Sequence, residues 1–220
     1  MHPQFVVPVD VTVNAVAPDE IFANGFDGDG GGECTPVQLL QDPSFEATDP
    51  NTFTNPDWDA FDSISGTPFC DETCDSGATI VARTGTWFVW FGGWDQQNTS
   101  WLSQNVVFPS GQPRWLNYWI NNQINVDPTA SLALSIDGTP VLTFPTDNGT
   151  GDYAAQTFEI PAQYLDGQAH DLRFDWAADS PAGEVGGAIV DDVTLDCEAQ
   201  PTGQVGGSRP LARTSRKHVR

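Results

Sequence analysis

The chain has 220 residues and carries 30 acidic against 8 basic side chains, a formal net charge of −22 at pH 7. Hydrophobic residues make up 39% of it, with eight Trp and thirteen Phe, which is too much apolar side chain for an intrinsically disordered protein. A surface this negative repels phosphate backbones and disfavours nucleic acid as a partner, whereas it suits divalent cations.

The chain begins with two segments that we expect to lie outside the main domain. Residues 1–17 predict one strand, the remnant of a preceding domain or extension, because Val6–Val16 alternates apolar and polar side chains. Residues 18–33 predict a Gly-rich acidic linker. We see no signal peptide and no stretch long enough to span a membrane. Because Val6–Val16 alternates like a strand, we expect the chain to be the C-terminal piece of a longer secreted protein.

Four cysteines allow three pairings, and their positions favour one of them. Cys34 and Cys197 bracket the central region, whereas Cys70 and Cys74 share one short segment, so we favour Cys34–Cys197 and Cys70–Cys74 disulfides. A zinc site is the alternative, but the C-x₃-C spacing has no second close pair and no nearby His. Disulfides indicate an oxidising compartment, in agreement with a secreted, extracellular protein.

The region 34–198 consists of short strand patterns separated by turn residues. Asp137-Gly138 is typical of a type I′ hairpin turn, and only 161–166 suggests a helical turn. Strands without intervening helices favour an all-β fold, an antiparallel β-sandwich. The expected strands are 37–46, 58–62, 78–83, 86–91, 101–108, 114–123, 130–137, 139–144, 154–160, 169–177 and 186–196.

After the sandwich, residues 199–220 predict a disordered tail. It is rich in Pro, Gly and Ser, and from Arg209 onward it carries five of the eight basic residues. This tail is either an interaction segment or an extension without function.

Two aromatic segments stand out within the sandwich. Thr86–Phe91 is apolar on both faces, which predicts a strand buried on both sides. Trp115–Gln123 instead has two unlike faces, one of them apolar with Leu116, Tyr118 and Ile120. The opposite face carries the indole and amide side chains of Trp115, Asn117, Trp119, Asn121 and Gln123.

Flat indole rings beside amides suit a sugar, whose C–H faces pack on aromatic rings while its hydroxyls need donors and acceptors. The Trp115–Gln123 face is therefore the candidate ligand-binding surface. The alternative is that the two rings cover the core under a loop and the amides face water.

No catalytic motif emerges from the sequence, and we expect a protein that is not an enzyme. Two of the three histidines, His2 and His218, lie in the terminal segments. The third, His170, lies in an alternating strand, where we expect it to face solvent. The zincin, nucleophile-elbow and P-loop patterns do not occur.

Three motifs resemble landmarks of carbohydrate-binding modules that have a galactose-binding-like jelly roll, the kind of accessory domain appended to secreted bacterial exoenzymes. They occur in the family's order and are Asp42-Pro43-Ser44-Phe45-Glu46, Ser103-Gln104-Asn105-Val106-Val107-Phe108-Pro109-Ser110-Gly111 and Val190-Asp191-Asp192-Val193-Thr194-Leu195. Asp42 departs from the family's usual Asn. The resemblance implies a jelly roll whose first and last strands are neighbours.

The resemblance also implies a structural Ca²⁺ between those two strands, with Glu46 and Asp192 as ligands and Asp191 as a weaker candidate. The function that it implies is a monomeric accessory module that binds a neutral poly- or oligosaccharide beside a parent catalytic domain in cis. The alternative is a structural C-terminal domain that stabilises a secreted protease or other exoenzyme and has no glycan ligand.

Overall fold

The structure is a computed structural model. It describes residues 37–74, 80–122, 127–144, 152–179, 186–200 and 203–204. The chain divides into two units, Met1–Cys34 and Thr35–Arg220, and all described residues belong to the second. The predicted segments 1–17 and 18–33 therefore lie outside the described residues.

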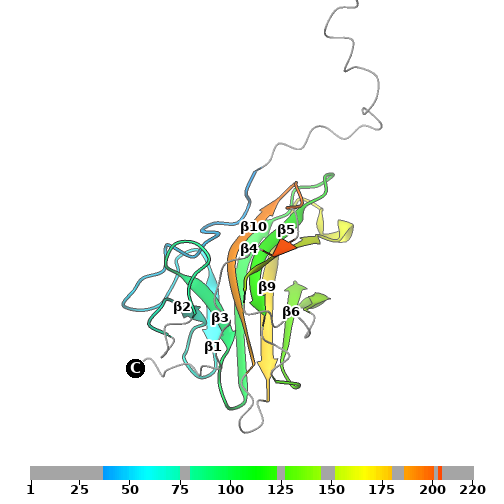
Figure 1. Cartoon of the computed structure of the whole chain (residues 1–220). Coiled ribbons are helices and arrows are strands. Elements are labelled where there is room, and N and C mark those ends of the chain that lie inside the picture. The colour runs from blue at the N-terminus through cyan, green and yellow to red at the C-terminus, as the bar shows by residue number, and fades with distance from the viewer. Residues whose placement is uncertain are drawn as a thin grey trace, which may run out of the picture. The chain divides into compact units, whose positions relative to one another are not determined.

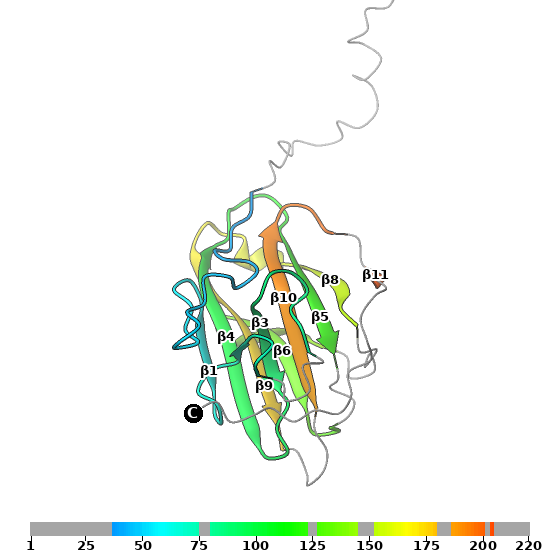
Figure 2. The ribbon, with the colours of Figure 1, turned by 60° about the vertical axis from the view of Figure 1, so that its left-hand side comes forward.

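The second unit is built of two antiparallel sheets, shown as ribbons in Figures 1 and 2. Sheet A has the strand order β1 (Asp59–Asp62), β4 (Asn98–Val107), β9 (Ala169–Ala178), β6 (Ser131–Ile136) and β7 (Thr139–Thr143). Sheet B has the order β11 (Gly203–Gln204), β8 (Ala154–Glu159), β5 (Trp115–Asn122), β10 (Gly187–Asp196), β3 (Phe88–Gly92) and β2 (Phe69–Cys70). The predicted all-β antiparallel sandwich is confirmed.

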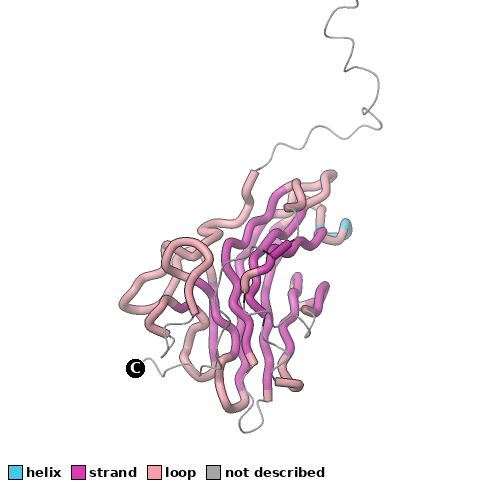
Figure 3. Tube along the Cα trace, in the orientation of Figure 1, coloured by secondary structure: helices cyan, strands magenta, loops and turns pink. Residues whose placement is uncertain are grey.

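Helix contributes almost nothing to the described part of the chain (Figure 3). One 3-10 turn, Ala162–Tyr164, lies inside the predicted turn 161–166. The type I′ hairpin is also confirmed, since Asp137 and Gly138 both have positive φ, 51° and 74°. Within the described ranges, no helix is long and apolar enough to cross a membrane.

The main core lies between the two sheets. Leu116, Tyr118 and Ile120 of β5 are buried there, as the alternation of that strand predicts. Tyr118 meets Phe174 of β9 edge to face, with ring centroids 6.0 Å apart at 79°. Such an aromatic pair adds about 0.5–1.5 kcal/mol beyond the apolar area it buries.

A second apolar cluster covers the outer face of sheet B. Phe88 and Trp90 of β3 enter this cluster, while Val89 and Phe91 of the same strand enter the main core. The prediction that this strand is buried on both sides is therefore confirmed. The remaining buried members of the cluster are Cys70, Cys74, Ile80, Tyr153 and Ile189.

Strand β10 contains a β-bulge in its pairing with β5. Asp191 lies opposite Trp119, but Thr194 lies opposite Asn117, so β10 holds one more residue than its partner between these pairs. Asp192 has the left-handed φ of 48° there. Because of the added residue, Val190 and Val193 on either side of the bulge both point into the main core.

The opening segment 37–46 is not a strand, contrary to the prediction. Asp42 and Phe45 have φ angles of 42° and 64°, which interrupt an extended backbone. Phe45 is fully buried, so its packing maintains the unusual conformation. The segment still runs beside β10, because the Leu39 amide donates to the Leu195 carbonyl at 3.0 Å.

Other predicted boundaries also need correction. Residues 80–83 of the predicted strand 78–83 are irregular, and the two-residue strands β2 and β11 were not predicted, because so few residues show no alternation. The predicted disordered tail 199–220 includes Gln200, whose amide donates to Asn117, and Gly203–Gln204, which pairs with β8.

Candidate functional site

The outer face of sheet A is open to solvent, because alternate residues of β4 and β9 point away from the core. Those of β4 are Thr99, Trp101, Ser103, Asn105 and Val107, and most of them are exposed or partly exposed. Those of β9 are Ala169, Asp171, Arg173, Asp175 and Ala177, all exposed or partly exposed. Polar side chains share this face with Val107, Ala169 and Ala177, and aromatic rings lie at one edge of it.

An aromatic pair lies on this face at the edge of the sheet. Phe61 of β1 is the register partner of Trp101 of β4, and their rings are stacked with centroids 6.3 Å apart at 29°. Phe61 exposes 42% of its surface and Trp101 is partly exposed. The pair therefore presents flat apolar surface to solvent.

Arg173 lies beside this pair in a fixed position. Its guanidinium carbon is 4.4 Å from the centroid of the Trp101 ring, a cation–π contact. Its Nε donates to Asp175 Oδ1 at 2.6 Å, and Asp175 Oδ2 accepts from Ser135 Oγ at 2.7 Å. Among the described residues no other hydrogen bond uses the Arg173 side chain, so its terminal nitrogens are available as donors.

We call Phe61, Trp101, Arg173 and Asp175 the platform. It combines a flat ring surface with guanidinium donors and a carboxylate acceptor at the ring edge. Such a surface can stack on a flat ligand and hydrogen-bond to its edge. The sequence signal for the platform is the alternation Thr99, Trp101, Ser103, which places Trp101 on one strand face with polar residues.

The predicted ligand surface of β5 lies on the outer face of sheet B and is largely covered. Trp115 and Trp119 are partly buried, so the rings are neither fully open nor fully enclosed. Asn117 and Asn121 each expose only 4% of their surface. Gln123 lies outside the described residues.

Asn117 is a structural residue in this arrangement. Its Nδ2 donates to the Glu198 carbonyl at 2.9 Å, while its Oδ1 accepts from Thr157 Oγ1 at 2.8 Å and from the Gln200 amide at 2.9 Å. The segment 198–200 thus lies across β5, and the Asn117 amide is already used by the chain itself. The sequence could not show this, because the partners lie about 40 and 80 residues away.

Trp119 contacts a second arginine rather than solvent alone. The guanidinium carbon of Arg83 is 3.7 Å from the centroid of its ring. Arg83 also forms a salt bridge with Asp192. Trp119 further packs against the second apolar cluster, so part of its role is to cover sheet B.

The carboxylates predicted to bind calcium all contact the segment Arg83–Trp87. Glu46 Oε1 accepts from the amides of Thr86 and Trp87, each at 2.8 Å. Gly85 lies so close to this carboxylate that a Cβ there would be 2.3 Å from Oε1. Gly85 also has a left-handed φ of 64°, so both its backbone conformation and this close approach favour glycine at position 85.

Asp191 is fully buried beneath the same segment. Its Oδ2 accepts from the amides of Arg83 at 2.7 Å and Thr84 at 3.2 Å, and its Oδ1 accepts from the Asp192 amide at 2.7 Å. Burial, and next the adjacent charge of Asp192, raise the pKa of Asp191 to about 7.

In this arrangement the residues do not fit a calcium ion. Ca²⁺ takes six to eight oxygen ligands, whereas these carboxylates accept N–H and O–H groups, and a guanidinium lies at Asp192. No group of three or more His, Cys, Asp or Glu that could hold a metal occurs among the described residues.

The cysteines give a mixed result. Cys197 is in a disulfide, and its predicted partner Cys34 lies outside the described residues. Cys70 and Cys74 are both buried in the second apolar cluster and are not joined by the predicted disulfide. Buried thiols pack as small apolar side chains, which accounts for the position of this pair without a covalent bond.

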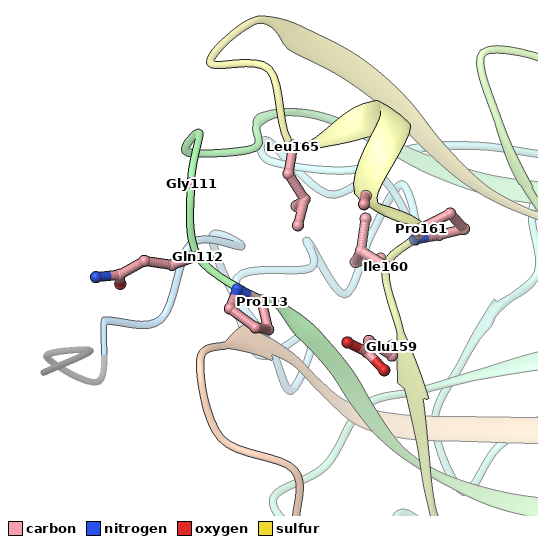
Figure 4. A pocket seen from close by; sticks show the side chains of 8 residues that line it. Gly111, Gln112, Pro113, Glu159, Ile160, Pro161 and Leu165 are labelled. Atoms are coloured by element: carbon pink, nitrogen blue, oxygen red, sulfur yellow. The ribbon is translucent and has the colours of Figure 1, made fainter. Parts of the chain in front are cut away.

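Hollows open at the surface of the described part of the chain, and two of them can be compared with the platform. The first, of about 600 Å³, lies between the β4–β5 and β8–β9 connections (Figure 4). Its lining includes Pro113, Ile160 and Leu165, and Gln112 points away from the other labelled side chains. The second, of about 670 Å³, includes Gln97 and Thr99 in a polar lining. Neither is lined by an aromatic residue of the described chain, so neither matches the platform as a stacking surface.

His170 faces inward, contrary to the prediction of a solvent-facing position, and exposes 7% of its surface. Its Nδ1 lies 2.7 Å from Asp137 Oδ2 and its Nε2 lies 3.1 Å from Asp166 Oδ1. These two carboxylates, Asp137 first, raise the pKa of His170 above its usual value. The imidazole therefore ties the β6–β7 hairpin to the β8–β9 connection.

Comparison with known proteins found no matching family model and no matching curated relative. The chain is similar to several solved structures. One is the carbohydrate-binding module TmCBM61 in complex with β-1,4-galactotriose, at 17% identity over 74% of this chain and 99% of that one, with a TM-score of 0.46.

A second similar structure is the K3 cleaved adhesin domain of Lys-gingipain from Porphyromonas gingivalis, at 13% identity over 74% of this chain and 99% of that one, with a TM-score of 0.47. A third is the Stig cyclase Fisc from Fischerella, at 15% identity over 74% and 98%, with a TM-score of 0.48. Because these proteins differ in function, the role of this chain has to be argued from its own residues.

Proposed function

We propose that this chain is a non-catalytic binding module that holds a neutral poly- or oligosaccharide on the platform of sheet A. The observation that carries the proposal is the exposed stack of Phe61 on Trp101, with Arg173 held at its edge. A protein gains little stability by exposing such rings, whereas a sugar ring packs its C–H face on them.

The polar groups of the platform complement this stacking. The terminal nitrogens of Arg173 and the carboxylate of Asp175 offer donors and acceptors to hydroxyl groups. The net charge of −22 repels polyanionic chains, which favours neutral glucans, xylans or mannans as ligands. Stacking and hydrogen bonds to neutral groups predict binding that changes little with salt.

An accessory role beside a parent catalytic domain, which the sequence resemblance implies, is part of this proposal. Secretion belongs to the same proposal. The disulfide at Cys197 suits an oxidising compartment, and a polysaccharide ligand is met outside the cell.

The experiment compares two tryptophan truncations in the full chain, W101A and W119A. Affinity electrophoresis or calorimetry with the three neutral polysaccharides measures binding, and thermal melting measures stability. We expect W101A to melt nearly as the wild type does and to lose binding. W119A should retain binding but melt lower, since Trp119 packs on the second cluster and on Arg83.

If W119A loses binding and W101A retains it, the polysaccharide binds on the outer face of β5 and not on the platform. A wild-type protein that binds none of the polysaccharides would leave the structural role, a domain that stabilises a secreted exoenzyme, as the better account.

A further inference from the structure

Glu46, Asp191 and Asp192 bind one five-residue segment, Arg83–Trp87, that lies on the outer face of sheet B. Together these residues have six carboxylate oxygens, and five of them accept a hydrogen bond or take part in a salt bridge. These are Glu46 Oε1 and both oxygens of Asp191 and Asp192. The donors are four amides of the segment, the Asp192 amide, the Thr84 hydroxyl and the Arg83 guanidinium.

Donors in these positions compete with a calcium ion for the same oxygens. Glu46 Oε1 and Asp191 Oδ2 each accept two amides, which uses both lone pairs of each oxygen, and the guanidinium beside Asp192 repels a divalent cation. The two adjacent carboxylates of Asp191 and Asp192 still need a positive charge nearby, because Asp191 is fully buried beside Asp192. Two adjacent carboxylates without a positive partner disfavour the charged form of each other.

Arg83 supplies that partner from within the segment. Its guanidinium pairs with Asp192 Oδ2 on one side and lies on the Trp119 ring on the other. Its backbone amide donates to Asp191. A single residue therefore contacts both carboxylates of the bulge and the neighbouring strand β5.

We propose that Arg83 takes the place of the calcium ion that the sequence resemblance implies. Its guanidinium provides the positive charge that holds the segment Arg83–Trp87 onto the bulge of β10. The fold then needs no metal ion at Glu46, Asp191 and Asp192.

The first test measures thermal melting of R83M, which keeps an unbranched apolar side chain but removes the charge. R173M is the matched control, because Arg173 also lies on a Trp ring and pairs with a carboxylate, but on the solvent face of sheet A. We expect R83M to melt about 3–12 °C lower than the wild type and R173M to change much less. R83K, which restores the charge, should recover part of the loss and serves if R83M does not fold.

The second test asks whether a cation binds with Arg83 in place. Tb³⁺, a calcium substitute, emits when a nearby tryptophan is excited, and Trp119 lies close enough to serve. We expect the wild type and D192N to give the same emission and the same small response of melting to Ca²⁺ and EGTA. Any response that D192N retains arises at another position and agrees with the proposal.

Two results would overturn the proposal. One is Tb³⁺ emission or a calcium-dependent rise in Tm that the wild type shows and D192N lacks, because a cation would then bind beside Arg83. The other is an R83M protein that melts as the wild type does. Neither result depends on whether the platform binds a polysaccharide.

Discussion

Replacement of Asn117 by Ala tests whether the β5 face is structural, since this side chain joins three parts of the fold. The change removes one hydrogen bond to the Glu198 carbonyl, one from Thr157 and one from the Gln200 amide. Each is worth about 1 kcal/mol net, so N117A should destabilise the protein by about 3 kcal/mol. For a domain of this size, this corresponds to a fall in Tm of about 6–12 °C.

The assay is thermal melting combined with hydrogen exchange of the Gln200 amide. Exchange at Gln200 should accelerate in N117A even where the segment opens locally before the rest of the domain unfolds. The control is N105A, because Asn105 is an exposed residue of β4 on the other sheet and its truncation should change stability by less than about 0.5 kcal/mol. The reasoning is refuted if N117A melts and exchanges as the wild type does.

Two further predictions concern stability. The His170 pKa is raised by its carboxylate partners, so its contribution is complete below the unfolded pKa of about 6.5 and is lost as the pH rises through the folded value. The Tm difference between wild type and H170N should therefore be larger at about pH 6 than at about pH 9, and a difference that grows with pH would contradict this sign. In G92A the new Cβ would meet Trp176 Cζ2 at 2.4 Å, whereas in G111A, also at positive φ, it meets nothing within 4 Å. Urea denaturation should show a loss of about 1–2 kcal/mol for G111A and a clearly larger loss for G92A, and equal losses would contradict the predicted clash.

The fold was predictable because strand alternation is a local property. The apolar face Leu116, Tyr118 and Ile120 and the doubly buried β3 both followed from a period of two, and the hairpin followed from Asp137-Gly138. The opening strand was not predictable in this way. Its positive φ angles fall on Asp42, whose carboxylate accepts hydrogen bonds from Ala47 and Asn55, and on Phe45, which is fully buried.

The candidate site was less predictable, because the exposure of a strand face depends on distant segments. The sequence shows that Trp119 and Asn117 share one face of β5, but not that 198–200 covers it or that Arg83 lies on the Trp119 ring. The platform was unpredictable for a second reason, because it combines residues that are distant in the sequence. Phe61, Trp101 and Arg173 come from three strands, and only the strand order of sheet A makes these strands neighbours.

The bulge in β10 has a consequence for how this strand tolerates insertions and deletions. It resets the alternation, so Val190 and Val193 face the same side although three positions separate them. Removal of Asp192 would restore a regular strand, in which Val193 would directly oppose Tyr118 and would still share the core face with Val190 and Leu195. The bulge is therefore a position in β10 where loss of one residue keeps both faces of the strand, although it removes the Asp192 contacts with Arg83 and Thr84. The same deletion in a regular part of the strand would turn every later side chain to the opposite face.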